Sequence, residues 1–155
     1  MSSYRLEGPE ATHAFGRRLG QLAPAGLVIA AYGDLGAGKT TMAQGVAAGL
    51  GVPADHYVNS PTFAILQIHP GRLPFYHMDL YRLGDLDEAY GIGLDEAIGT
   101  DGVAFIEWPS RIPDLLPADH VQLKLSYEGS MRRVELRACG PVSETFLQRC
   151  ALLNA

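Results

Sequence analysis

A glycine-rich loop at the start of an expected helix constrains this 155-residue chain more than any other feature. Residues 33–40 read GDLGAGKT and match the pattern G-x-x-x-x-G-K-[S/T] at every fixed position. They follow the apolar run 27–31, and the segment 39–50 after them reads as a helix ended by Gly51. Glycines let backbone N–H groups approach an anion, and a helix N-terminus favours negative charge. The sequence therefore predicts a phosphate-binding loop.

The side chains of the loop have separate expected roles. We expect the Lys39 ammonium over the β- and γ-phosphate oxygens, the Thr40 hydroxyl on Mg²⁺, and Thr41 at the α-phosphate. The expected nucleotide contacts along the loop are Asp34, Leu35, Gly36, Ala37, Gly38, Lys39, Thr40 and Thr41. The sequence has no N-K-x-D or T-K-x-D segment for a guanine-specific contact, so ATP is expected rather than GTP.

Two carboxylates are candidates for the second protein ligand of Mg²⁺. Glu107 follows the apolar residues 103–106, whereas Asp79 follows the more mixed residues 75–78. A buried central strand favours Glu107, which we assign to Mg²⁺, directly or through water. Asp79 is then expected near the γ-phosphate, to orient water or bind the metal's outer shell, with a strand-end cap as the alternative. His77 shares a strand face with Asp79 and is expected to orient it or to pack beneath the sheet.

Other residues near these motifs leave two interpretations open. Ser60 and Thr62 follow the loop helix, where they could sense the γ-phosphate or form an ordinary turn. Trp108, the single tryptophan, is either a core residue or an aromatic contact to a partner or loop at the nucleotide edge. Arg82 and Arg111 could stabilise phosphate charge or lie at the surface.

The periodicity of apolar residues predicts alternating helices and strands. Expected helices are 9–23, 39–50 and 142–153, with helical pieces in 84–102; expected strands are 26–33, 63–69, 73–83, 102–109, 120–129 and 131–138. Pro9 suits the first turn of its helix, and Ser143 is the expected cap of the last helix. We predict a single α/β domain over residues 1–155, a P-loop NTPase-like sandwich with a mostly parallel central sheet and a C-terminal antiparallel hairpin.

Composition narrows the classes of function. The net charge is −5 and basic residues occur at most in pairs, which disfavours a nucleic-acid backbone as a direct ligand. No apolar run approaches the roughly 20 residues of a membrane span, and the first residues do not resemble a signal peptide, so a cytoplasmic location is expected. Cys139 and Cys150 lack metal-binding spacing and are expected to be reduced thiols.

Four segments follow one another along the chain: YGDLGAGKTT at 32–41, SPTF at 60–63, HMDLYRL at 77–83 and IEWP at 106–109. In this order and at these separations they resemble the TsaE family of bacterial tRNA threonylcarbamoyladenosine biosynthesis proteins. The resemblance covers essentially the whole chain. It implies a P-loop α/β domain that binds ATP and Mg²⁺. It also implies a weak ATPase activity needed to threonylcarbamoylate the adenosine beside the anticodon in tRNAs reading A-starting codons.

The resemblance also implies partners and residue roles. The partners are TsaD and TsaB, whose complex is reset by the ATP cycle, with no direct tRNA binding by this chain and no membrane. The implied catalytic residues are Lys39, Asp79 and Glu107, and the implied metal ligands are Thr40 and Glu107. Thr12 is implied near the adenine, Arg132 as a nucleotide contact and Trp108 near the nucleotide. Ser110 departs from the longer polar residue that often follows EWP in relatives. A small-molecule P-loop kinase is the alternative, although no arginine-rich lid follows the strands.

Overall fold

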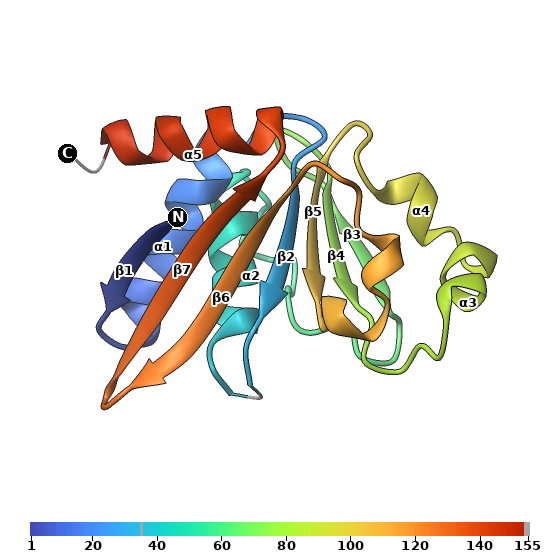
Figure 1. Cartoon of the computed structure of the whole chain (residues 1–155), viewed down its shortest axis with the longest axis horizontal. Coiled ribbons are helices and arrows are strands. Elements are labelled where there is room, and N and C mark those ends of the chain that lie inside the picture. The colour runs from blue at the N-terminus through green and yellow to red at the C-terminus, as the bar shows by residue number, and fades with distance from the viewer. Residues whose placement is uncertain (35, 154–155) are drawn as a thin grey trace.

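The computed structural model describes residues 1–34 and 36–153, and within them a seven-stranded mixed sheet has the order β1-β7-β6-β2-β5-β4-β3 (Figure 1). The strands are β1 Ser2–Leu6, β2 Val28–Tyr32, β3 Leu66–His69, β4 Phe75–Asp79, β5 Val103–Glu107, β6 His120–Glu128 and β7 Met131–Cys139. The central strands β6, β2, β5 and β4 pair in parallel, and the outer pairs are antiparallel. The predicted hairpin is confirmed, but the mostly parallel sheet is corrected to a parallel centre with antiparallel edges.

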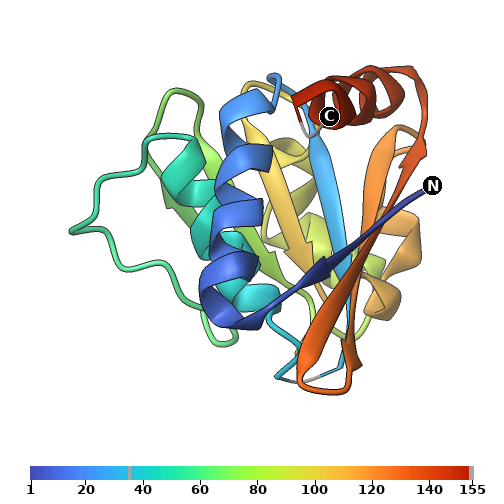
Figure 2. The same ribbon diagram turned by 90° about the vertical axis from the view of Figure 1, so that its left-hand side faces the viewer.

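Helices cover both faces of the sheet. One face carries α1 Gly8–Leu22, α2 Lys39–Gly49 and α5 Pro141–Leu153, whose buried residues join one apolar cluster (Figure 2). The other face carries α3 Leu86–Gly91, α4 Leu94–Ala97 and the 3-10 turns η1 Pro109–Arg111 and η2 Pro113–Leu115, which pack over the second apolar cluster. On the central strand β5, Phe105 faces the first cluster while Ala104 and Ile106 face the second. This burial on both faces explains the continuous apolar runs of β2 and β5.

Helices α1 and α2 approach closely through glycines. A Cβ on Gly16 would lie 2.5 Å from the Met42 carbonyl oxygen, and one on Gly45 would collide with the His13 carbonyl oxygen. A side chain at these positions would push the two helix backbones apart. Because α2 begins at the end of the glycine-rich loop, this packing also fixes the position of the first turn of α2.

Several boundaries differ from the expected ones. The edge strand β1 was not predicted, and the strand expected at 73–83 is confined to β4, because the chain turns immediately after Asp79. Ser143 lies inside α5 rather than at its cap. The cap is instead supplied by Asp119, whose carboxylate accepts hydrogen bonds from the N–H groups of Val142 and Ser143 at 2.8 and 3.1 Å. None of the helices in the described ranges is long and apolar enough to span a bilayer.

Candidate functional site

The glycine-rich loop leaves β2 at its carboxyl end and enters α2. Gly36 and Gly38 have φ angles of 81° and 107°, a left-handed backbone that favours glycine. Helix α2 starts at Lys39, and Gly38 provides no side-chain cap. The first N–H groups of a helix have no intrahelical acceptor, so those of α2 can serve an anion.

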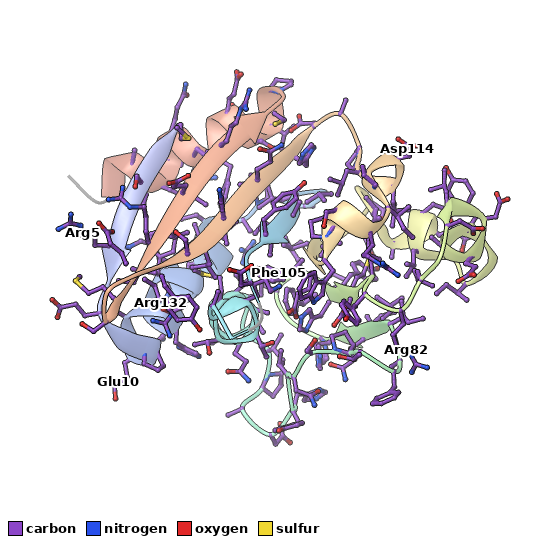
Figure 3. The ribbon with its side chains drawn as sticks, turned by 60° about the horizontal axis from the view of Figure 1, so that its bottom comes forward. Arg5, Glu10, Arg82, Phe105, Asp114 and Arg132 are labelled. Atoms are coloured by element: carbon purple, nitrogen blue, oxygen red, sulfur yellow. The ribbon has the colours of Figure 1, made fainter. Side chains whose placement is uncertain are left out.

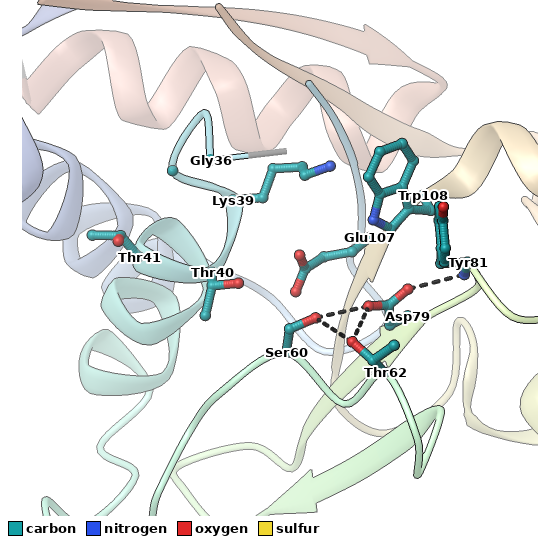
Figure 4. Close-up of a pocket in the computed structure, with 11 residues that line it drawn as sticks. Gly36, Lys39, Thr40, Thr41, Ser60, Thr62, Asp79, Tyr81, Glu107 and Trp108 are labelled. Carbon is teal, nitrogen blue, oxygen red and sulfur yellow. Dashed lines mark hydrogen bonds between the residues drawn. The ribbon is translucent and has the colours of Figure 1, made fainter. Parts of the chain in front are cut away.

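A cleft of about 530 Å³ opens in front of this helix terminus (Figure 4). Its lining combines the loop, the loop after α2, and the carboxyl ends of β4 and β5. The lining residues are Gly36, Gly38, Lys39, Thr40, Thr41, Ser60, Thr62, Asp79, Tyr81, Glu107 and Trp108. Most of the residues predicted for the phosphates and Mg²⁺ are therefore brought together. A ligand cleft outside the carboxyl ends of parallel strands is usual in α/β sheets.

Lys39 is held inside the cleft, with 5% of the residue exposed. Its Nζ donates a hydrogen bond to the Gly33 carbonyl oxygen at 2.6 Å and lies 3.6 Å from the centroid of the Trp108 ring. Burial lowers the pKa of the Lys39 ammonium, while the negative charges of Glu107 and Asp79 oppose this shift. A cation stripped of water and paired with neutral groups is ready to attract a phosphate.

Trp108 reaches Lys39 through an unusual backbone conformation. Its φ and ψ angles are 56° and 46°, the left-handed region that a bulky residue rarely adopts. Such a conformation costs of order 1–3 kcal/mol and persists where the surroundings impose it, often at functional sites. Here it ends β5 abruptly and places the indole ring beside the ammonium and 5.1 Å from the Tyr81 ring. This position favours the interpretation of Trp108 as an aromatic contact at the nucleotide edge over its interpretation as a core residue.

The two carboxylates lie side by side at the ends of β4 and β5, where Asp79 is the register partner of Glu107. Both residues are buried. Asp79 Oδ2 accepts hydrogen bonds from Ser60 Oγ at 2.7 Å and Thr62 Oγ1 at 3.2 Å, and its Oδ1 accepts the N–H of Tyr81 at 2.9 Å (Figure 4). Asp79 therefore caps its strand and also ties the loop after α2 to the cleft.

His77 contacts the other carboxylate, not Asp79, which it was expected to orient. His77 Nε2 lies 2.6 Å from Glu107 Oε2, so His77 contacts this carboxylate rather than orienting Asp79. In the register of the sheet His77 lies opposite Phe105 and Asp79 lies opposite Glu107, so the contact between His77 and Glu107 is a diagonal one between neighbouring strands. The imidazole and the long glutamate side chain span this diagonal on the same face of the sheet.

The donor set fits Mg²⁺ and a nucleotide. Thr40, Asp79 and Glu107 present hydroxyl and carboxylate oxygens to the cleft, the ligand type that Mg²⁺ prefers. Across the described residues, no three His, Cys, Asp or Glu side chains gather as a metal cluster. A cation here would therefore rest on a few protein oxygens together with phosphate and water, as is usual for Mg²⁺.

The remaining predicted nucleotide contacts lie around the loop rather than in the cleft lining. Asp34 and Ala37 belong to the loop, and Leu35 lies outside the described residues. Thr12 is buried on α1, its hydroxyl donates to the Gly8 carbonyl oxygen at 3.2 Å, and its methyl group faces Gly38.

Within the described residues, Arg132 is linked to the loop through a tyrosine of the hairpin. Its guanidinium lies 4.0 Å from the ring centroid of Tyr127, and the Tyr127 hydroxyl donates to the Gly36 carbonyl oxygen at 2.6 Å. Arg82 and Arg111 also lie over aromatic rings, those of Phe63 and Tyr81. Arg82 and Arg132 lie on opposite sides of the molecule (Figure 3).

Two aromatic residues of the site were not predicted. Tyr81 lines the cleft and packs on Trp108, and Tyr127 holds the loop from the hairpin. The signal for Tyr81 was its place two residues after Asp79, where the chain leaves a strand at the cleft. Tyr127 gave no such signal, because it is 91 residues from Gly36 along the chain.

Known proteins resemble this chain over most of its length. Residues 6–134 match the family model "Threonylcarbamoyl adenosine biosynthesis protein TsaE". The tRNA threonylcarbamoyladenosine biosynthesis protein TsaE of Bacillus subtilis is 41% identical, over 84% of this chain and 80% of the relative. The protein of the same name from Treponema pallidum is 40% identical, over 74% and 83%. The crystal structure of Bacillus subtilis YdiB superposes with a TM-score of 0.86 at 32% identity, covering 99% of this chain and 96% of YdiB. The chain belongs to the TsaE family.

Proposed function

We propose that this protein is a weak, Mg²⁺-dependent ATPase that supports threonylcarbamoylation of the adenosine beside the anticodon in tRNAs reading A-starting codons. It acts in the cytoplasm on a complex of TsaD and TsaB and does not catalyse the transfer itself. The observation that carries the ATPase assignment is the meeting of Lys39, Thr40, Asp79 and Glu107 in one cleft at the N-terminus of α2. The family and its relatives' names support the pathway.

Each group in the cleft has a role in this proposal. Lys39 and the N–H groups of the loop hold the phosphates, and Lys39 exchanges its neutral partners for them. Thr40 and Glu107 hold Mg²⁺, which when bound neutralises charge on the phosphates. Asp79 positions water near the γ-phosphate, and Thr41 adds a contact at the α-phosphate.

The hydrogen bonds of Asp79 support slow hydrolysis by the isolated protein. Both of its carboxylate oxygens already accept hydrogen bonds, from Ser60, Thr62 and the N–H of Tyr81. Carboxylate oxygens occupied in this way are less available to accept a hydrogen bond from a water molecule and orient it. A partner that moves residues 60–62 would release one oxygen of Asp79 and accelerate the reaction.

The surface beside the cleft supports a protein as the target of the cycle. Phe63, which follows the lining residue Thr62, is 84% exposed, and Tyr81, which lines the cleft, is 53% exposed. Exposed aromatic side chains of this kind are common where proteins bind one another. The chain's net charge of −5 also fits a role in which tRNA is held by the partners.

Phosphate release from ATP, with and without purified TsaD–TsaB, tests the proposal. We expect the protein alone to release phosphate slowly and the complex to change that rate. Lys39→Ala, which serves as the blank, should release no phosphate with or without the complex. Glu107→Ala should also abolish turnover. A rate of phosphate release that the complex does not change would show that TsaD–TsaB is not the target of this protein. Acceleration by a metabolite instead would favour the alternative, a small-molecule kinase.

A further inference from the structure

His77 is a fully buried histidine whose side chain, among the described residues, makes its one hydrogen-bond contact to a proposed Mg²⁺ ligand. It has 0% exposure, and its Nε2 lies 2.6 Å from Glu107 Oε2. The imidazole ring lies between aromatic neighbours, 5.8 Å from the ring centroids of both Phe75 and Phe105. These rings leave the imidazole little freedom to turn away from the carboxylate.

The surroundings of the ring assign its proton. Nε2 faces a carboxylate oxygen, which can only accept a hydrogen bond when ionised. Nδ1 is buried and has no partner among the described residues. An N–H there would be an unsatisfied buried donor, which is costly, whereas a lone pair is tolerated more easily. The geometry therefore favours a His77 that carries a proton on Nε2 and donates a hydrogen bond from it to Glu107.

The other carboxylate oxygen, Glu107 Oε1, has no hydrogen bond from the side chains and backbone groups of the described residues. The terminal torsion of a glutamate is broad, so a carboxylate without such a contact would sample several orientations. One oxygen fixed by His77 leaves the other free for a cation in the cleft.

We propose that His77 is a positioning residue for Mg²⁺, which holds the Glu107 carboxylate in the orientation that binds the metal. This inference rests on the proposed Mg²⁺ site. Hydrogen-bond partners of metal ligands commonly change metal affinity by about 10–100-fold when removed. The effect should appear in the coupling between Mg²⁺ and nucleotide, and not in the binding of nucleotide without metal.

Side-chain geometry offers a matched set of variants. The amide nitrogen of Gln can occupy the position of His Nε2, so His77→Gln keeps a donor toward Glu107. His77→Asn places its amide nearer Nδ1, and His77→Leu has no donor, so both lose the contact. His69 is another buried histidine, on β3, whose Nε2 contacts Gln67 rather than Glu107. His69→Asn therefore controls for loss of a buried imidazole.

The measurement is calorimetric titration with adenylyl-imidodiphosphate, a slowly hydrolysed ATP analogue, with and without Mg²⁺. The affinity with Mg²⁺ divided by the affinity without Mg²⁺ reports metal binding independently of turnover. We expect this ratio to fall about tenfold or more in His77→Asn and His77→Leu. It should be retained in His77→Gln and in His69→Asn, and the metal-free affinity should be the same in all variants.

Two results would overturn the inference. One is a normal Mg²⁺ effect in whichever of His77→Asn and His77→Leu folds, as judged by thermal unfolding. The other is a loss in His77→Gln as large as in those variants, because a retained donor must rescue a positioning role. A wild-type protein whose nucleotide affinity does not respond to Mg²⁺ would instead overturn the proposed metal site, and the proposed function with it.

Discussion

Replacing Lys39 by methionine should weaken ATP binding by about 10- to 150-fold. Among the described residues, Nζ contacts a neutral carbonyl oxygen and the face of an indole ring, inside a cleft where Lys39 is 5% exposed. Transfer to a phosphate would replace these contacts with hydrogen bonds between charged groups, each worth about 1.5–3 kcal/mol. Because about 1.4 kcal/mol is a factor of ten, losing one such bond gives the stated range.

The chain offers a matched control for this change. Lys124 is the only other lysine, and it lies exposed on β6, away from the cleft. Lys124→Met removes the same charge and should alter the affinity less than about twofold, since exposed charges are screened. Calorimetric titration of both variants with the ATP analogue measures the difference. Equal losses in the two variants, or none in Lys39→Met, would refute the assignment of Lys39 to the phosphates.

Three further predictions concern residues outside the cleft that hold the loop and the helices in place. Tyr127→Phe removes the hydrogen bond to the Gly36 carbonyl oxygen and should weaken ADP binding a few-fold in calorimetry; an unchanged affinity would show that the bond does not restrain the loop. Gly16→Ala should lower the free energy of unfolding by about 1–3 kcal/mol in urea, because its methyl group would meet the backbone of α2, whereas Gly91→Ala, in open space, should cost nothing. Asp119→Ala should cost about 1–2 kcal/mol by loss of the α5 cap. Hydrogen bonding, chiefly from a serine hydroxyl, lowers the pKa of Asp119. The ionised Asp119 carboxylate should therefore contribute fully to the free energy of unfolding above the ordinary pKa of 3.8, and this contribution should disappear as the pH falls through the lower folded-state pKa. Acid unfolding curves of Asp119→Ala should lack this loss.

The phosphate loop could be predicted from sequence because its geometry is local. Eight consecutive residues contain the glycines, the lysine and the threonine, and the neighbouring strand and helix are short and strongly patterned. The carboxylates could be predicted for a related reason. Each follows a strand-like segment, apolar before Glu107 and mixed before Asp79, and parallel strands bring their carboxyl ends to one edge of the sheet, where Asp79 and Glu107 become register partners.

The contacts that were not predicted join segments far apart in the chain. His77 and Glu107 are 30 residues apart, and no pattern within either strand shows that they meet across the sheet. Asp119 caps a helix that begins more than 20 residues later. The edge strand β1 is short and half-exposed, so its pairing with β7 left only a weak periodicity. The antiparallel pairing of β1 with β7 is of this long-range kind, and the pairing of β3 with β4 was also not predicted, which explains why the sheet is less parallel than expected.

The most direct test of the account is the number of threonylcarbamoyl groups that a limiting amount of TsaD–TsaB transfers to tRNA in the presence of this protein and ATP. If ATP hydrolysis in the cleft resets the complex, the wild-type protein should support many transfers per complex. Lys39→Ala should then support about one, whereas Lys124→Ala should match the wild type. Repeated transfer with Lys39→Ala, at the wild-type rate, would contradict the central claim that this cleft drives the cycle.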